Sequence, residues 1–233
     1  MTFRLPNLED LSVFRLRCQI IRRELEKIDC SLWDRPVVFD VGANDGSTFL
    51  PFARALPWAR IYAFEPTPEL VAKIRSQSVG LKNYRLVPKA IGETPGTAPF
   101  NVAGTANWGC SSFLEFSDGL EVTWPDRTDF KVTQKIEVEV IRLDAFVREQ
   151  KIERIDFLHV DTQGTDLAVL RSLGDEIRRV RGGVIEVPQS REVMLYRGQH
   201  TREEAEAFLD THGFKIWKIV PAQNEDDIFY RRR

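Results

Sequence analysis

The 233-residue sequence is poor in the residues that mark disulfide-linked or zinc-binding proteins. It holds only three cysteines, Cys18, Cys30 and Cys110, which lie far apart and form no CxxC pair. An odd number of scattered cysteines argues against a disulfide framework and favours free thiols in a reducing cytoplasm. The three histidines show no ligand spacing with the cysteines, so no zinc site is predicted.

Long apolar runs and an excess of charge of one sign are also missing. No apolar stretch approaches the roughly 18–20 residues that a membrane-spanning helix needs, and the first residues lack the order of a secretion signal. Lysine and arginine number 33 against 35 aspartates and glutamates, a net charge of −2. Such a chain has no basic field to attract nucleic acid or anionic lipid. We therefore expect a cytoplasmic protein with no transmembrane segment and no nucleic-acid partner.

What is present is an ordinary globular composition, 42% hydrophobic and 29% charged, at a length typical of a single domain. Short apolar runs predict strands at 36–41, 60–64, 84–87, 155–160 and 183–187. Helical patterns lie between or after them, at 47–55, 68–77, 165–172 and 201–211. This alternation predicts an α/β fold, a parallel sheet with helices on both faces. Two final runs, 214–219 and 227–230, predict an antiparallel hairpin at the sheet edge.

Two segments do not follow this alternation. Residues 1–35 carry apolar residues near a 3.6-residue period, which predicts an N-terminal helical extension packed on the domain or on a second subunit in a homodimer. A membrane-surface helix is the alternative. Residues 92–135 are rich in aromatic and small polar residues and too long for a simple connector. We interpret them as short antiparallel strands and loops inserted between the third and fourth core strands.

The clearest functional signal is the glycine-containing loop FDVGANDG at residues 39–46. Gly42 and Gly46 have no side chain, so the backbone there can approach a ligand closely. Asn44 stands where the dinucleotide fingerprint needs glycine, and the Gly-Lys-Ser/Thr of a P-loop is absent. Because the loop also lacks lysine and arginine, a cofactor without phosphate is favoured.

Glu65 ends the second predicted strand, downstream of this loop. A carboxylate at that place can accept hydrogen bonds from both ribose hydroxyls of an adenosine. Loop and acid together, without phosphate ligands, predict S-adenosylmethionine as the cofactor.

These segments resemble the FkbM-type methyltransferases, a family of class I S-adenosylmethionine-dependent O-methyltransferases. The matching segments are FDVGANDG (39–46), AFEP (63–66), IDFLHVDTQG (155–164) and LYRGQ (195–199). The resemblance runs from about residue 36 to about residue 230, and its more specific motifs are the DTQG and EP segments. The chain departs from the family at His159, where lysine is frequent, and at Gln163 or Asp166, where glutamate is frequent.

The resemblance implies a Rossmann-like fold with a mostly parallel seven-stranded sheet that ends in the C-terminal antiparallel hairpin. It also implies that the acceptor is a hydroxyl of a sugar, a glycan or another small natural product. The cofactor contacts that it implies come from Asp40, Gly42, Asn44, Gly46 and Glu65, with Ala90 and Ile91 against the adenine.

An alcohol is a poor nucleophile until its proton is shared with a base. Asp161 is the first candidate base, since it follows the fourth strand at the sheet edge where ligands bind. His159 lies two residues earlier on the same strand face, and its alternative is a hydrogen-bonded core histidine. Glu186 ends the next strand. Asp161 and Glu186 together are also candidates to hold a divalent metal, although no third ligand is evident and no metal ligand is assigned.

The aromatic insert is expected to cap the acceptor. Trp108 and Trp124 are candidates to stack on a sugar face, and Ser111 and Ser112 to hydrogen-bond its hydroxyls. The alternative is that these aromatic residues form a small core of the insert itself. Tyr196 follows the fifth strand and is expected to close the other side of the cleft.

Three other functions are less well supported by the sequence. A nicotinamide-dependent Rossmann oxidoreductase is disfavoured by Asn44 in the glycine loop. A non-catalytic module of the same fold is disfavoured by the intact loop and Glu65. A nucleic-acid methyltransferase is disfavoured by the net charge and by the absence of an Asn/Asp-Pro-Pro-Tyr/Phe sequence after the fourth strand.

Overall fold

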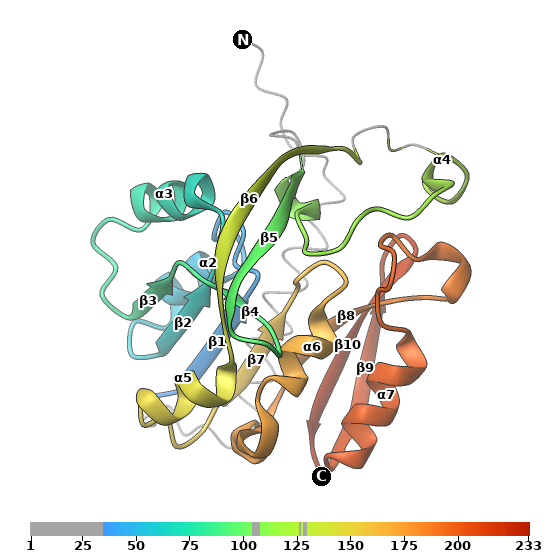
Figure 1. The fold of residues 1–233 in the computed structure, drawn as a ribbon. Coiled ribbons are helices and arrows are strands. Elements are labelled where there is room, and N and C mark those ends of the chain that lie inside the picture. Colours follow the sequence, from blue (N-terminus) through green and yellow to red (C-terminus); the bar gives the residue numbers. More distant parts are fainter. Residues whose placement is uncertain (1–34, 104–107, 126, 128–129) are drawn as a thin grey trace.

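The computed structural model describes residues 35–103, 108–125, 127 and 130–233, so the predicted N-terminal extension lies outside the described residues. Seven strands form one sheet in the order β3-β2-β1-β7-β8-β10-β9 (Figure 1). Five of them run parallel: β1 (Val37–Val41), β2 (Arg60–Phe64), β3 (Tyr84–Val87), β7 (Phe157–Val160) and β8 (Gly182–Pro188). The hairpin of β9 (Phe214–Pro221) and β10 (Glu225–Arg232) is antiparallel, and the predicted sheet is confirmed.

Successive side chains of a strand point to opposite faces of the sheet, and each face has its own apolar core. Along β1, Phe39 and Val41 belong to one core and Val38 to the other. The first core includes side chains of α5 (Leu143–Glu149), α6 (Asp166–Arg171) and α7 (Arg202–Thr211). The second includes side chains of α2 (Phe49–Ala55) and α3 (Pro68–Gln77). Helices therefore cover both faces, as predicted.

The segment between β3 and β7 builds a second sheet of three strands, in the order β4-β6-β5. The long strands β5 (Gly96–Ala103) and β6 (Val132–Ile141) pair antiparallel, and the short β4 (Ala90–Ile91) pairs parallel with β6. Antiparallel strands were predicted here, but these are 8 and 10 residues long rather than short. Their connection contains the helical turns η1 (Trp108–Cys110) and α4 (Leu120–Thr123).

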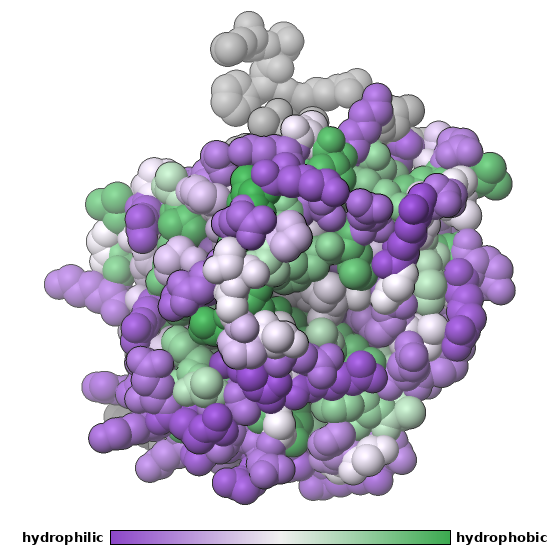
Figure 2. All heavy atoms as spheres, in the orientation of Figure 1, coloured by the Kyte–Doolittle hydropathy of each residue, from purple (hydrophilic) through white to green (hydrophobic). Residues whose placement is uncertain are grey.

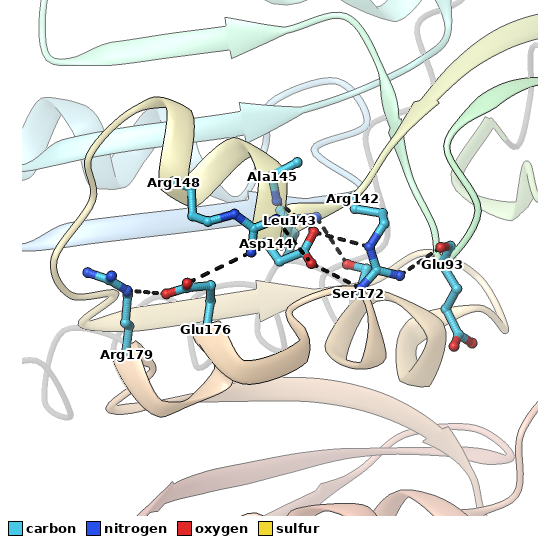
Figure 3. Close-up of polar contacts among 9 residues, drawn as sticks. All are labelled: Glu93, Arg142, Leu143, Asp144, Ala145, Arg148, Ser172, Glu176 and Arg179. Carbon is cyan, nitrogen blue, oxygen red and sulfur yellow. Dashed lines mark hydrogen bonds and ion pairs between the residues drawn. The ribbon is translucent and has the colours of Figure 1, made fainter.

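The base of the β5–β6 hairpin is attached to the main sheet's helices through Arg142 (Figure 3). The Arg142 guanidinium donates from Nη1 to the Glu93 carbonyl oxygen over 2.7 Å, and from Nε to Asp144 Oδ1 over 3.1 Å. The backbone N–H groups of Leu143 and Asp144 donate to Ser172 at the end of α6. Because these links include backbone as well as charged groups, they hold the hairpin's base more firmly than an exposed ion pair alone would.

The surface carries no broad apolar area on the face drawn in Figure 2, where hydrophobic residues form small groups among hydrophilic ones. Among the described residues, no helix combines the length and the apolar character that crossing a membrane requires.

Candidate active site

A cavity of about 590 Å³, counting the part open to solvent, lies at the carboxyl ends of β1, β2 and β7. This is the edge at which open α/β sheets bind ligands. The second sheet completes the cavity, because Phe100 of β5 and Phe113 of the following segment line it. The predicted cofactor residues among its lining are Gly42, Asn44, Glu65, Ala90 and Ile91.

Glu65 is the buried carboxylate of this cavity, with an exposed fraction of 4%. Its Oε2 accepts a hydrogen bond from the Asn44 backbone N–H over 2.9 Å, and its Oε1 accepts one from the Thr67 N–H over 2.8 Å. Burial raises the pKa of Glu65 to about 7, against the two backbone donors that favour the ionised form. Each carboxylate oxygen has a second acceptor site. The carboxylate therefore retains capacity for two ligand hydroxyls.

The glycine loop has a backbone shape that only some residues tolerate. Gly42, Asn44 and Gly46 all have positive φ, at 85°, 50° and 82°. A side chain on Gly46 would meet Leu50 of α2, 2.7 Å from the ideal Cβ position. Gly46 is not among the residues that line the cavity, and its positive φ and close contact with Leu50 relate it to turn shape and helix packing.

Asp40 and His159 form a buried pair beneath the loop. Their Oδ1 and Nδ1 atoms lie 2.6 Å apart, on the adjacent strands β1 and β7. Neither residue lines the cavity, and both are nearly inaccessible to solvent. Asp40 is thus absent from the cavity lining, and the burial and pairing of His159 agree with its alternative, a hydrogen-bonded core histidine.

Asp161 lines the cavity beside the predicted cofactor residues. Its Oδ1 accepts a hydrogen bond from Gln163 Nε2 over 2.7 Å, and the same nitrogen donates to Glu186 Oε2 over 3.1 Å. Glu186 itself does not line the cavity, so it meets Asp161 through Gln163. In the sequence, Gln163 stands out only as a departure from the family pattern.

The second carboxylate of this turn, Asp166, begins α6 and is buried. It accepts backbone hydrogen bonds from Thr162 over 3.0 Å and from Gly164 over 3.2 Å. Burial, followed by the charge of Asp161, raises the pKa of Asp166 to about 7. Within the described part of the chain, no group of three or more His, Cys, Asp or Glu residues is arranged to hold a metal ion.

Most of the predicted acceptor residues do not face the cavity. Trp124 packs edge-to-face on Phe130 in a small core that also includes Tyr196. A small core of this kind was the alternative interpretation of the insert's aromatic residues. The Tyr196 hydroxyl lies 2.9 Å from Gln163 Oε1 and 2.8 Å from the Cys110 carbonyl oxygen. Ser112 Oγ donates to the Gln163 carbonyl oxygen over 2.6 Å. Tyr196 and Ser112 therefore support Gln163 without lining the cavity, whereas Trp124 belongs to the insert's own core.

Ser111 does line the cavity, where its Oγ accepts from the Ala103 N–H over 3.0 Å. The Trp108 side chain lies outside what the structure describes. The aromatic residues that the insert does present to the cavity are Phe100 and Phe113, packed edge-to-face with ring centroids 5.1 Å apart. Composition alone does not separate them from Trp124, since all three lie in one aromatic-rich stretch.

Comparison with known proteins agrees with this geometry. Residues 40–216 match the model of the methyltransferase FkbM domain. The chain belongs to the FkbM methyltransferase family. The 2-O-methyltransferase NoeI of Sinorhizobium fredii is 30% identical over 203 residues, which cover 84% of this chain and 79% of NoeI. The 31-O-demethyl-FK506 methyltransferase FkbM of Streptomyces tacrolimicus is 28% identical, over 92% of this chain and 89% of that protein.

A solved structure supports the fold. The magnesium protoporphyrin IX methyltransferase of Synechocystis with bound S-adenosylhomocysteine superposes with a TM-score of 0.55 at 11% identity, covering 100% of this chain and 90% of that one. This FkbM-family chain is thus a class I, S-adenosylmethionine-dependent O-methyltransferase, as the sequence predicted. The site fits the cofactor, since a buried carboxylate with acceptor capacity and an apolar wall that includes Leu70 and Ile91 line one cavity.

Proposed function

We propose that this FkbM-family enzyme methylates a hydroxyl of a sugar, a glycan or another small natural product. The observation that carries the proposal is that Asp161, a candidate base, and Glu65, a candidate ribose ligand, line one cavity. Support also comes from the relatives, because one is named a 2-O-methyltransferase and another a methyltransferase of 31-O-demethyl-FK506.

In this proposal the cofactor contacts divide among three elements. Glu65 accepts the ribose hydroxyls, and Ala90 and Ile91 of β4 contact the adenine. The backbone of the loop at Gly42 and Asn44 borders the remainder of the cofactor. The cofactor supplies a methyl group activated by a positively charged sulfur.

We assign to Asp161 the role of the base that accepts the proton of the acceptor's hydroxyl group. A carboxylate at the cavity wall accepts a hydrogen bond from the acceptor hydroxyl and takes its proton as the oxygen becomes the nucleophile. The second sheet restricts water over the cavity through Phe100 and Phe113, which raises the strength of electrostatic contacts inside. We therefore assign the insert, residues 92–135, the role of acceptor cap within a single domain.

The decisive test is incubation with methyl-labelled cofactor and a panel of hydroxylated acceptors, followed by mass spectrometry of the products. We expect label in an ether linkage on a sugar or natural-product hydroxyl, lost in Asp161→Asn. A matched control is Asp210→Asn, because Asp210 is exposed on α7, outside the insert, and pairs with Arg233. Label on nitrogen or on nucleic acid instead would contradict the proposed acceptor class.

A further inference from the structure

We propose that Gln163 is a positioning residue that directs the Asp161 carboxylate toward the acceptor by bridging it to Glu186. The proposal rests on the proposed function, in which Asp161 takes the acceptor's proton. Gln163 lines the cavity together with Asp161, so the bridge borders the space where an acceptor would meet the cofactor.

The bridge uses both protons of one amide nitrogen. Gln163 Nε2 lies 2.7 Å from Asp161 Oδ1 and 3.1 Å from Glu186 Oε2. A primary amide nitrogen carries two protons and an ionised carboxylate only accepts, so one proton serves each partner. The reverse orientation would set the amide oxygen against two carboxylate oxygens, which repel it. The two acids therefore determine which way the amide points.

The other end of the side chain is also held. Gln163 Oε1 lies 2.9 Å from the Tyr196 hydroxyl, and burial raises the pKa of Tyr196 well above its usual value, so this phenol stays a donor. The phenol's one proton is shared between Gln163 and the Cys110 carbonyl oxygen.

The backbone of Gln163 is fixed by the insert. Its φ is +56°, a left-handed conformation that non-glycine residues adopt infrequently. The Ser112 hydroxyl donates to its carbonyl oxygen over 2.6 Å, and Gly164 follows with a φ of +91°. A residue held in this way at both its backbone and its side chain has little freedom to move, as positioning requires.

The bridge lies between two carboxyl groups that would otherwise repel each other. Asp161 and Glu186 both reach one nitrogen, and the buried Asp166 adds a third carboxyl whose pKa is raised partly by Asp161. Without a donor between them, two carboxylates so placed repel each other and turn apart or take up a proton. A neutral amide that donates to both acids holds each of them in place.

The first test compares Gln163→Leu with Gln150→Leu, a matched change at an exposed contact with Arg85. We expect Gln163→Leu to lower kcat about 10²-fold, the effect of misplacing a catalytic group by about 1 Å. The Kd for S-adenosylhomocysteine should change less than about threefold, and Gln150→Leu should resemble the wild type. A Gln163→Leu variant with wild-type kcat would overturn the proposal.

The second test needs no acceptor, so it separates failure of the bridge from failure of the proposed function. Gln163→Glu puts a third carboxylate between Asp161 and Glu186, and three carboxylates at one point favour a divalent cation. We expect this variant to melt below the wild type at pH 8 and to recover on addition of Mn²⁺, with saturable Mn²⁺ binding by calorimetry. The wild type and Gln150→Glu should show neither response. Equal Mn²⁺ responses in all three proteins would show that a carboxylate at position 163 does not meet both Asp161 and Glu186, which would overturn the bridge. This comparison decides the question if Gln163→Leu does not fold.

Discussion

The backbone carbonyl oxygen of Asp161 occupies the space that a side chain on Gly42 would need, 1.9 Å from the ideal Cβ position. Gly42 follows β1 and Asp161 follows β7, and the two strands are neighbours in the sheet. The close approach of these two loops places Asp161 at the wall of the cavity that Gly42 also lines. This glycine therefore serves the protein's own packing at the site as well as any approach of a ligand.

Gly42→Ala should reduce the free energy of unfolding by about 2–4 kcal/mol, because backbone strain adds to a clash with a backbone atom. Gly80→Ala is the matched control, since Gly80 has a φ of +88° but nothing within 4 Å of its ideal Cβ. The control should lose only the conformational cost of about 1–2 kcal/mol. Urea denaturation of both variants measures the difference, and equal losses would mean that the loops move apart at no cost.

Glu65→Gln should weaken binding of S-adenosylmethionine by about 1.5–3 kcal/mol, the range for hydrogen bonds to a charged group. The substitution also turns an amide NH₂ toward one of the two backbone donors, Asn44 or Thr67. We therefore expect a lower melting temperature of the cofactor-free protein as well. Calorimetric titration measures the affinity, and an unchanged Kd would remove Glu65 from the ribose site.

Cofactor binding should release protons near neutral pH. Burial raises the pKa of Glu65 to about 7 in the free protein, and ribose donors stabilise the ionised form. Linkage then predicts release of about 0.5 proton at pH 7, almost none at pH 8.5, and an affinity that falls as the pH drops below 7. Calorimetry in buffers of different ionisation enthalpy reports this number. In Glu65→Gln the release should vanish, and release that persists there would assign it to another group.

Asp161→Asn should lower turnover about 10²–10⁴-fold, the usual contribution of a positioned base, with little change in cofactor affinity. His159→Gln is the informative comparison. Because His159 is buried against Asp40, its replacement should reduce stability more than turnover measured on the folded fraction. If His159→Gln abolishes turnover in folded protein while Asp161→Asn stays active, the histidine is the base.

Trp124→Ala should act on stability, with a loss of about 3–5 kcal/mol typical of a buried aromatic residue. Trp124 is 4% exposed and packs against Phe130 in the insert's core. Phe113→Ala, at the cavity wall, should instead weaken ligand binding. Steady-state kinetics and thermal melts separate the two, and a raised acceptor KM in folded Trp124→Ala would restore the stacking hypothesis.

The order of strands and helices follows from local sequence patterns. Runs such as 60–64 are apolar enough to be buried on both faces, and positions such as Gly42 and Gly46 signal a tight loop because few residues accept positive φ. The helix α5 was not predicted, although it is as long as the predicted helix α2.

The sequence by itself determined the class of fold and the cofactor, and it predicted a ligand site at one edge of the sheet, because strand ends, loop glycines and Glu65 act through local geometry. Tertiary structure alone decided which polar residues meet. His159 pairs with Asp40 from a neighbouring strand, and Gln163 meets Glu186 and Tyr196, far away in the chain. Tertiary structure also decided that Phe113 lines the cavity and that Trp124 packs in the core of the insert. Such contacts depend on strand register and on how an insert folds back, and neither leaves a periodic signal in the chain.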